Sequence, residues 1–170
     1  MTISKPEIGH ILFATDLSEN AERAFAYAAG MAEAYGARVT VLHVIERLPP
    51  NAEMLMTAFL GYRDVEEFKK KTETEIITRL KQRITQFCTA AADEISECPL
   101  VLDRVIVEPG RAVDRIRHHV TAGGFDALVM GSRGHGLVKE ALMGGTSRKV
   151  IQDSPIPVFI IPMAPKEPAQ

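Results

Sequence analysis

The sequence predicts an α/β fold in which five parallel strands form a doubly wound sheet with helices on both faces. Short apolar, β-branched segments alternate with helical periodicities in the order βαβαβαβαβ. Most of the strand segments are apolar on both faces, which is typical of a sheet covered on both sides and therefore of parallel strands. The chain has 170 residues, about the length of one domain. We therefore expect a single domain over residues 1–170.

Five segments rich in Val, Ile, Leu and Phe are bounded by turn-forming residues, which is the pattern of strands. The expected strands are HILFAT (10–15), ARVTVLHVI (37–45), LVLDRVIV (100–107), DALVMG (126–131) and IPVFIIP (156–162).

Between them, apolar residues recur near every third or fourth position, which predicts helices over about 21–35, 62–92, 112–120 and 146–152. Gly36 is the expected C-cap of the first helix. The last helix ends before Ser154 and Pro155, because the residue before a proline disfavours helical backbone.

The second crossover is longer than the ideal unit. Its segment 46–62 carries an apolar cluster (Met54, Leu55, Met56, Phe59 and Leu60) and is expected to be a long loop. This segment could be a lid over a ligand or could pack against the core or a partner, and plain packing is favoured. The core is expected over 8–162, and 163–170 is expected to be a frayed tail.

Composition excludes several classes of protein. The net charge of −2 gives no bulk attraction to nucleic acid or to an anionic membrane. No apolar run approaches the length of about eighteen residues that a transmembrane helix needs. The N-terminus lacks the apolar stretch of a signal peptide, and Cys88 and Cys98 form no CxxC pattern. We therefore expect a cytoplasmic protein with neither nucleic acid nor membrane as a partner.

Glycines gather directly after the fourth strand, in MGSRGHGLVKEALMGGTSRKV (130–150). Glycine can adopt positive φ and lets a ligand approach the backbone closely. Ligands of open α/β sheets collect at the carboxyl ends of the strands, and amides at a helix N-terminus bind anions. The stretch therefore predicts a phosphate-binding loop. It is not a P-loop, because Leu137 stands where the lysine belongs, and it is not a dinucleotide fingerprint, because Lys139 stands at the third glycine.

The spacing of Gly131, Gly134 and Gly144 resembles the G-x2-G-x9-G loop of the ATP-binding branch of the universal stress protein family. The segments ILFATDLSENAERAFAYA, VLHVIE, DALVMGSRG and SPIPVFII are also similar to parts of that family. The resemblance implies a Rossmann-like sheet with strand order 3-2-1-4-5, which would bring Asp16 and Gly131 together. It implies ATP or another adenine nucleotide as the ligand, with Mg²⁺.

The resemblance also implies the residues of the ATP site. Adenosine would meet Ala14, Thr15, Asp16 and the backbone of Val44; ribose and phosphates would meet Met130, Gly131, Arg133 and Gly134; the phosphate tail would meet Gly144, Gly145, Thr146 and Ser147. One departure is Gly145, which stands where the family has Ser or Thr. The amide remains there and the hydroxyl is lost.

Several of these side chains have more than one expected role. Asp16 could accept from a ribose hydroxyl, hold a metal-bound water, or cap the following helix. Arg133 could neutralise phosphate or lie on the surface, and Thr146 and Ser147 suit both an N-cap and a phosphate donor. His43 is expected to be a buried histidine with its hydrogen bonds satisfied.

The function that the resemblance implies is a regulatory stress-response module that binds ATP and hydrolyses it slowly at most. The sequence offers no defensible general base and no P-loop lysine, so no catalytic residue is assigned. One alternative is a family member that acts through protein contacts without nucleotide. Another is an adenylating enzyme of the related hydrolase type, which ATDLSENA opposes because it lacks glycine. The last strand (156–162) is an apolar edge that predicts a homodimer.

Overall fold

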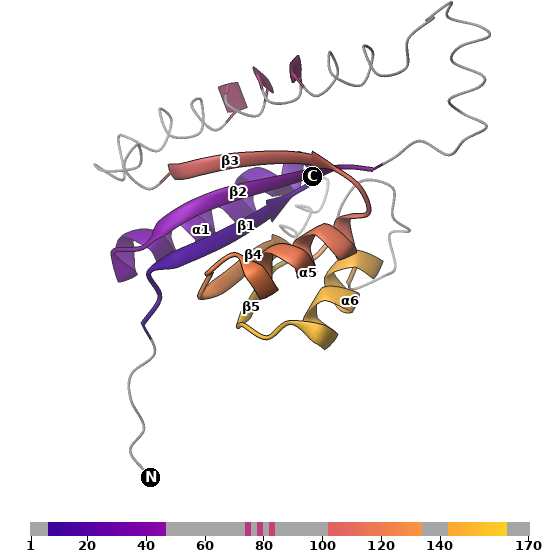
Figure 1. Cartoon of the computed structure of the whole chain (residues 1–170). Coiled ribbons are helices and arrows are strands. Elements are labelled where there is room, and N and C mark those ends of the chain that lie inside the picture. Colours follow the sequence, from indigo (N-terminus) through magenta and orange to yellow (C-terminus); the bar gives the residue numbers. More distant parts are fainter. Residues whose placement is uncertain are drawn as a thin grey trace, which may run out of the picture.

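Five parallel strands form the sheet of this protein (Figure 1). The computed structural model describes residues 7–46, 74–75, 78–79, 82–83, 102–133 and 143–162. Its strands are β1 (His10–Thr15), β2 (Arg38–Ile45), β3 (Leu102–Pro109), β4 (Ala127–Gly131) and β5 (Val158–Ile161). They lie in the order β3-β2-β1-β4-β5, and every neighbouring pair is parallel. The predicted fold class and strand order are confirmed.

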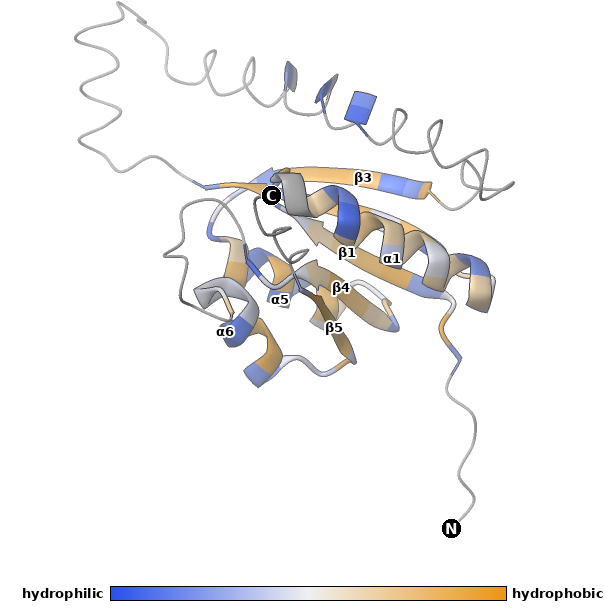
Figure 2. Cartoon of the chain, turned by 180° about the vertical axis from the view of Figure 1, so that it is seen from behind, coloured by the Kyte–Doolittle hydropathy of each residue, from blue (hydrophilic) through white to orange (hydrophobic). Residues whose placement is uncertain are grey.

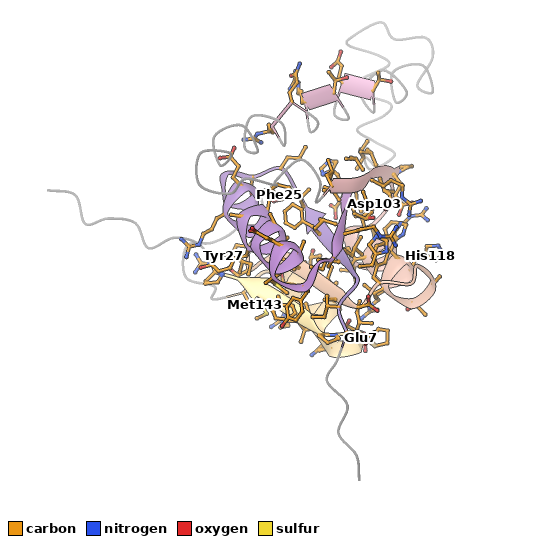
Figure 3. The ribbon with its side chains drawn as sticks, turned by 90° about the vertical axis from the view of Figure 1, so that its left-hand side faces the viewer. Glu7, Phe25, Tyr27, Asp103, His118 and Met143 are labelled. Atoms are coloured by element: carbon orange, nitrogen blue, oxygen red, sulfur yellow. The ribbon has the colours of Figure 1, made fainter. Side chains whose placement is uncertain are left out.

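Helices cover both faces of the sheet (Figures 1 and 2). Helix α1 (Glu19–Tyr35) packs on one face, where the rings of Phe13 and Phe25 lie 5.5 Å apart. Figure 3 shows Phe25 directed from α1 toward the sheet. Helices α5 (Ala112–Ala122) and α6 (Gly145–Asp153) pack on the other face, where Ile116 and Val150 are buried against Leu128. The central strands are thus buried on both sides, as a parallel sheet requires.

Four strands differ from their predicted bounds, and two of them, β2 and β4, differ only in beginning one residue later. β3 ends two residues later than predicted, because its pairing with β2 continues to the contact of Ile45 with Pro109. β5 begins later and ends earlier, over 158–161 instead of 156–162. A local turn, in which the hydroxyl of Ser154 donates to the carbonyl of Ile156 over 2.8 Å, delays its start. Pro162 has no N–H with which to continue a ladder.

Helix boundaries follow the predictions closely. Gly36 is the C-cap of α1 in the left-handed conformation, with a φ of 65°. Its predicted role is confirmed, since glycine takes this conformation without steric cost. α6 begins at Gly145, one residue before the predicted Thr146.

Several predictions fall on other parts of the chain. Of the helix expected over 62–92, residues 74–75, 78–79 and 82–83 are described, and they are helical. Segment 47–62 and the tail 163–170 lie outside the described residues, as do both cysteines. Among the described residues, no helix has the length and apolar character that crossing a membrane would need.

His10 lies at the start of β1, at the sheet edge where the strands begin. Its Nε2 atom is 2.9 Å from the hydroxyl oxygen of Thr40 and 3.7 Å from a carboxylate oxygen of Asp103. Burial lowers the pKa of His10, and the charge of Arg38 lowers it further, while Asp103 opposes both. Native His10 therefore takes up a proton less readily than His10 in the unfolded chain.

This difference predicts that the protein loses stability in mild acid. As the pH falls through the unfolded-state pKa, about 6.5, the unfolded chain binds protons that the native state binds only at lower pH. The free energy of unfolding should fall between about pH 7.5 and about pH 5.5, and less in His10→Gln than in the wild type. Denaturant titrations of both proteins at both pH values measure this. Equal losses would show that His10 does not contribute.

Candidate functional site

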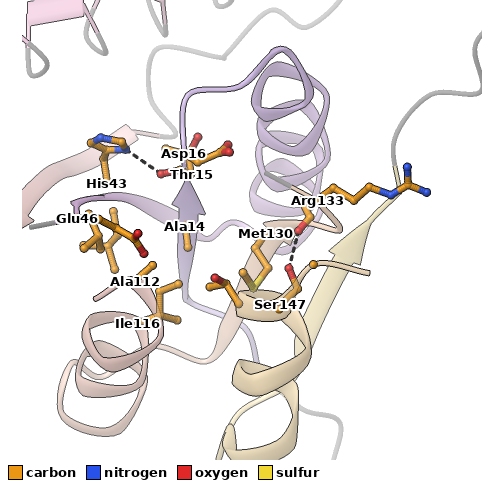
Figure 4. A pocket seen from close by; sticks show the side chains of 16 residues that line it. Ala14, Thr15, Asp16, His43, Glu46, Ala112, Ile116, Met130, Arg133 and Ser147 are labelled. Carbon is orange, nitrogen blue, oxygen red and sulfur yellow. Dashed lines mark hydrogen bonds between the residues drawn. The ribbon is translucent and has the colours of Figure 1, made fainter. Parts of the chain in front are cut away.

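A cavity of about 410 Å³ lies at the carboxyl ends of the central strands (Figure 4). The strand order places β1 between β2 and β4, so that Ala14 pairs with Leu42 on one side and with Met130 on the other. The N-terminal ends of α5 and α6 reach the same edge and close the cavity. This is the point at which the strand order reverses, where open α/β sheets place their ligands.

Every predicted site residue within the described part of the chain lines this cavity. They are Ala14, Thr15, Asp16, Val44, Met130, Gly131, Arg133, Gly144, Gly145, Thr146 and Ser147. Gly134 lies outside the described residues. Residues from β1 and from the glycine stretch, far apart in the sequence, are therefore brought together as the resemblance implies.

Five lining residues were not predicted: Leu42, His43, Glu46, Ala112 and Ile116. Leu42 shares a strand face with the predicted Val44, so a period of two could have indicated it. Ala112 and Ile116 lie one turn apart on α5, and their helical spacing predicts a shared face without showing what that face meets.

The turn between β1 and α1 holds Asp16 at the cavity. A carboxylate oxygen of Asp16 accepts hydrogen bonds from the amide of Ser18 (3.1 Å) and from its hydroxyl (2.8 Å). Ser18 is the N-cap of α1, so the N-cap role, one of the three left open for Asp16, is wrong. Asp16 braces the cap residue instead. Between them, Leu17 has a φ of 65°, and its amide donates to the hydroxyl oxygen of Thr15 over 3.1 Å. Such a conformation costs a leucine on the order of 1–3 kcal/mol.

His43 joins β2 to this turn. It is only 8% exposed, and its Nδ1 atom lies 2.9 Å from the carbonyl oxygen of Thr15. In the neutral ring this contact places the proton on Nδ1, which donates to the carbonyl. The expectation of a buried, hydrogen-bonded histidine is confirmed. Its ring also fixes the backbone that leads into Asp16.

The two ends of the glycine stretch are joined beneath the cavity. The hydroxyl of Ser147, which is 3% exposed, donates to the carbonyl of Gly131 over 3.0 Å. The amide of Gly144 donates to the carbonyl of Ser132 over 2.7 Å. The N-cap of α6 is Gly144, so the N-cap role, one of the two left open for Thr146 and Ser147, is wrong; both residues belong to the first turn.

The glycines that line the cavity have ordinary backbone conformations, and their lack of a side chain leaves space beside the backbone. The described glycines with positive φ are Gly36, Gly110 and Gly124, so Gly131, Gly144 and Gly145 do not use the positive φ that glycine can adopt. A Cβ at Gly131 would lie 3.3 Å from the carbonyl oxygen of Arg133, whereas a Cβ at Gly145 would meet nothing within 4 Å. The lack of room beside the carbonyl oxygen of Arg133 is therefore a reason for glycine at the end of β4, and the close approach of a ligand there stays a prediction.

Comparison with known proteins identifies the family. The model of the universal stress protein family matches residues 7–162. This chain belongs to the universal stress protein family. The "Universal stress protein in QAH/OAS sulfhydrylase 3′region" of Thermus aquaticus is 30% identical over 151 residues, which cover 89% of this chain and 96% of that protein.

Solved structures of the family share the fold. Universal stress protein UspA from Lactobacillus plantarum superposes with a TM-score of 0.68 at 20% identity, covering 92% of this chain and 99% of that one. The universal stress protein from Archaeoglobus fulgidus in complex with dAMP has a TM-score of 0.50 at 18% identity, with coverage of 92% and 98%.

The electrostatics of this universal stress protein's cavity come from helix ends and carboxylates. The first amides of α6 have no partner within the helix and carry the positive end of its dipole. The N-cap of α5, Arg111, makes no side-chain hydrogen bond to its helix, and the N-cap of α6, Gly144, has no side chain with which to make one. Asp16 and Glu46 bring carboxylates to the wall. Arg133 lines the cavity, but its side chain points away from it in Figure 4.

These residues fit an accompanying Mg²⁺ only in part. Carboxylate oxygens are ligands that Mg²⁺ prefers, and it takes its remaining ligands from phosphates and water. Within the described ranges, no three His, Cys, Asp or Glu side chains come together in a way that could hold a metal ion. A cation at Asp16 or Glu46 would therefore need ligands from a bound phosphate.

Proposed function

We propose that this universal stress protein binds an adenine nucleotide, ATP in the first place, at the carboxyl ends of β1 and β4. The observation that carries the proposal is the single cavity lined by Asp16, Gly131 and the first turn of α6. The structural relative in complex with dAMP supports the same class of ligand. The protein would act as a cytoplasmic regulatory module of a stress response.

The lining supports a division of the cavity into three parts. Apolar side chains of β2 and α5, among them Leu42 and Ile116, offer the base an apolar surface. The carboxylate of Asp16 would accept from a ribose hydroxyl. The amides of Gly145 and Thr146, at the positive end of α6, would receive the phosphates. Asp16 or Glu46 would help to hold an accompanying Mg²⁺, which would supply positive charge against the phosphates.

We propose sensing or storage of nucleotide in preference to rapid turnover. Among the described residues that line the cavity there is no lysine to neutralise phosphate charge. The Nδ1 atom of His43 is engaged with the carbonyl of Thr15. Efficient phosphoryl transfer depends on positioned charge at the phosphates, so hydrolysis would be slow at most.

Two substitutions of Asp16 separate its structural from its binding role. Asp16→Ala should weaken ATP binding by about one to two orders of magnitude, since a charged hydrogen bond contributes about 1.5–3 kcal/mol. It should also lower stability by about 1 kcal/mol through the loss of the brace on Ser18. Asp16→Asn keeps an oxygen for Ser18 and should lose affinity with little loss of stability. Calorimetric titration and denaturant unfolding measure both quantities; wild-type affinity in both variants would leave Asp16 only its bracing role.

Glycine substitutions test whether the phosphates approach bare backbone. Gly131→Val should abolish ATP binding while far-UV circular dichroism stays close to that of the wild type. Gly131→Ala should have an ATP affinity between those of the wild type and Gly131→Val, because a methyl group takes up less of the space beside the backbone. Its Cβ would lie 3.3 Å from the carbonyl oxygen of Arg133, so the change is tight but small.

Gly145→Ser supplies the opposite control. The site there is sterically open and its φ is not positive. The added hydroxyl should tighten binding by about tenfold or less, below the upper limit for one charged hydrogen bond. Titration calorimetry on the wild type and the three glycine variants is the measurement. If the wild type binds no nucleotide, the family's alternative of action through protein contacts is favoured; if Gly131→Val binds like the wild type, the glycines do not serve the ligand.

We also propose that the protein forms a closed homodimer through β5. β5 is an edge strand of the described sheet, and Phe159 on it is 38% exposed. An apolar edge favours pairing with a second chain, and prolines at 155, 157 and 162 limit further growth. Light scattering at micromolar concentration should report twice the mass of the chain, and Phe159→Lys should shift it toward the monomer. A monomeric wild type would contradict this.

A further inference from the structure

The turn that carries Asp16 is held by a side chain that belongs neither to the sheet nor to α1 and does not line the cavity. A guanidinium nitrogen of Arg83 donates a hydrogen bond to the carbonyl oxygen of Leu17. Its other terminal nitrogen lies 3.6 Å from a carboxylate oxygen of Glu22, on the first turns of α1. Arg83 belongs to the helical residues of the second crossover, 66 positions from Leu17 in the sequence.

The contact falls on a residue with an unfavourable backbone conformation, directly after the cavity-lining Asp16. Leu17 is the one non-glycine residue with positive φ in the described part of the chain. The conformation at Leu17 brings the amide and hydroxyl of Ser18 to the carboxylate of Asp16, which they hold at the cavity. A charged donor on the Leu17 carbonyl stabilises this conformation over the extended one that leucine ordinarily prefers.

The ion pair between Arg83 and Glu22 contributes less to the stability of the turn than the hydrogen bond does. The side chains of Arg83 and Glu22 are 41% and 58% exposed, so water screens their attraction and the pair alone contributes little. Its role is geometric, because it orients the guanidinium so that the other nitrogen meets the carbonyl. The hydrogen bond, and not the ion pair, is the contact that acts on the turn.

We infer that Arg83 is a positioning residue for the nucleotide site, which links the helix of the second crossover to Asp16 through the carbonyl of Leu17. The inference rests on the proposed function. Coupling between two sites is reciprocal. Nucleotide bound at Asp16 therefore strengthens the contact of Arg83 with the turn, and loss of that contact weakens nucleotide binding.

The test compares four variants of the full-length chain. Arg83→Gln removes the charge and shortens the donor. Arg79→Gln makes the same charge change at an exposed position one helical turn earlier and is the matched control. Glu22→Gln removes the ion pair alone, and Arg83→Lys keeps a charged donor. ATP affinity is measured by titration calorimetry, and exchange of the amides of residues 15–21 is measured by hydrogen–deuterium exchange without nucleotide.

Arg83→Gln should weaken ATP binding about five- to tenfold, near the lower end of site-to-site couplings. It should also speed amide exchange in the turn, whereas Arg79→Gln should change neither. Glu22→Gln should have a smaller effect, and Arg83→Lys should restore part of the affinity. A purely structural role would lower thermal stability in Arg83→Gln without changing affinity.

The two readouts separate this inference from the proposed function. If the exchange of residues 15–21 in Arg83→Gln equals that in Arg79→Gln, Arg83 does not hold the turn and the inference is overturned. The same follows if exchange changes while ATP affinity does not. If the wild type binds no ATP but Arg83→Gln speeds exchange of the turn, the proposed function fails and the positioning of the turn by Arg83 stands.

Discussion

Parallel pairing in a sheet that is buried on both faces is the constraint on which the rest of the structure depends. Strands that run in one direction must be joined by crossovers over a face, so all their carboxyl ends lie at one edge. In this chain that edge collects the ends of β1, β2 and β4 together with the first turns of α5 and α6. Polar groups at strand ends and free amides at helix ends meet there because the topology brings both to the same edge. The position of the cavity therefore depends on the fold, and the side chains determine only its lining.

The sequence predicts the elements and the topology well, because both depend on signals that are local or carried by the family's motif. Apolar runs define the strands, and the left-handed cap at Gly36 follows from glycine's freedom alone. The lining of the cavity is predicted where it lies within a motif, as for Asp16 and Gly131. It is missed where it depends on how a helix packs on the sheet. The spacing of Ala112 and Ile116 defines a face of α5 without showing that this face meets the end of β2. Strand bounds fail for the same reason, since pairing with β2 extends β3 to Pro109.

The glycines after β4 show that one residue type can serve different structural needs. Glycine can adopt positive φ, yet Gly131 and Gly145 have ordinary backbone conformations. Gly131 is short of room, whereas Gly145 is not. The two glycines therefore differ in what a side chain would cost, although their sequence context makes them look equivalent. The space around a backbone depends on tertiary packing, so neither the conformational propensity of glycine nor the spacing of glycines in the sequence predicts it.

The positive φ of Leu17 is the feature that sequence reasoning had least chance to find, because leucine is a poor residue for that conformation. Such strain persists only where the surroundings determine the backbone more strongly than its own preference. Here the surroundings come from three separate parts of the chain: Thr15 and Asp16 of the turn itself, His43 of β2 through the Thr15 carbonyl, and Arg83 of the second crossover. A turn held from so many sides keeps Asp16 in place before any ligand arrives. The conformational cost is met during folding, so the binding proposed at this carboxylate would need little rearrangement of the backbone.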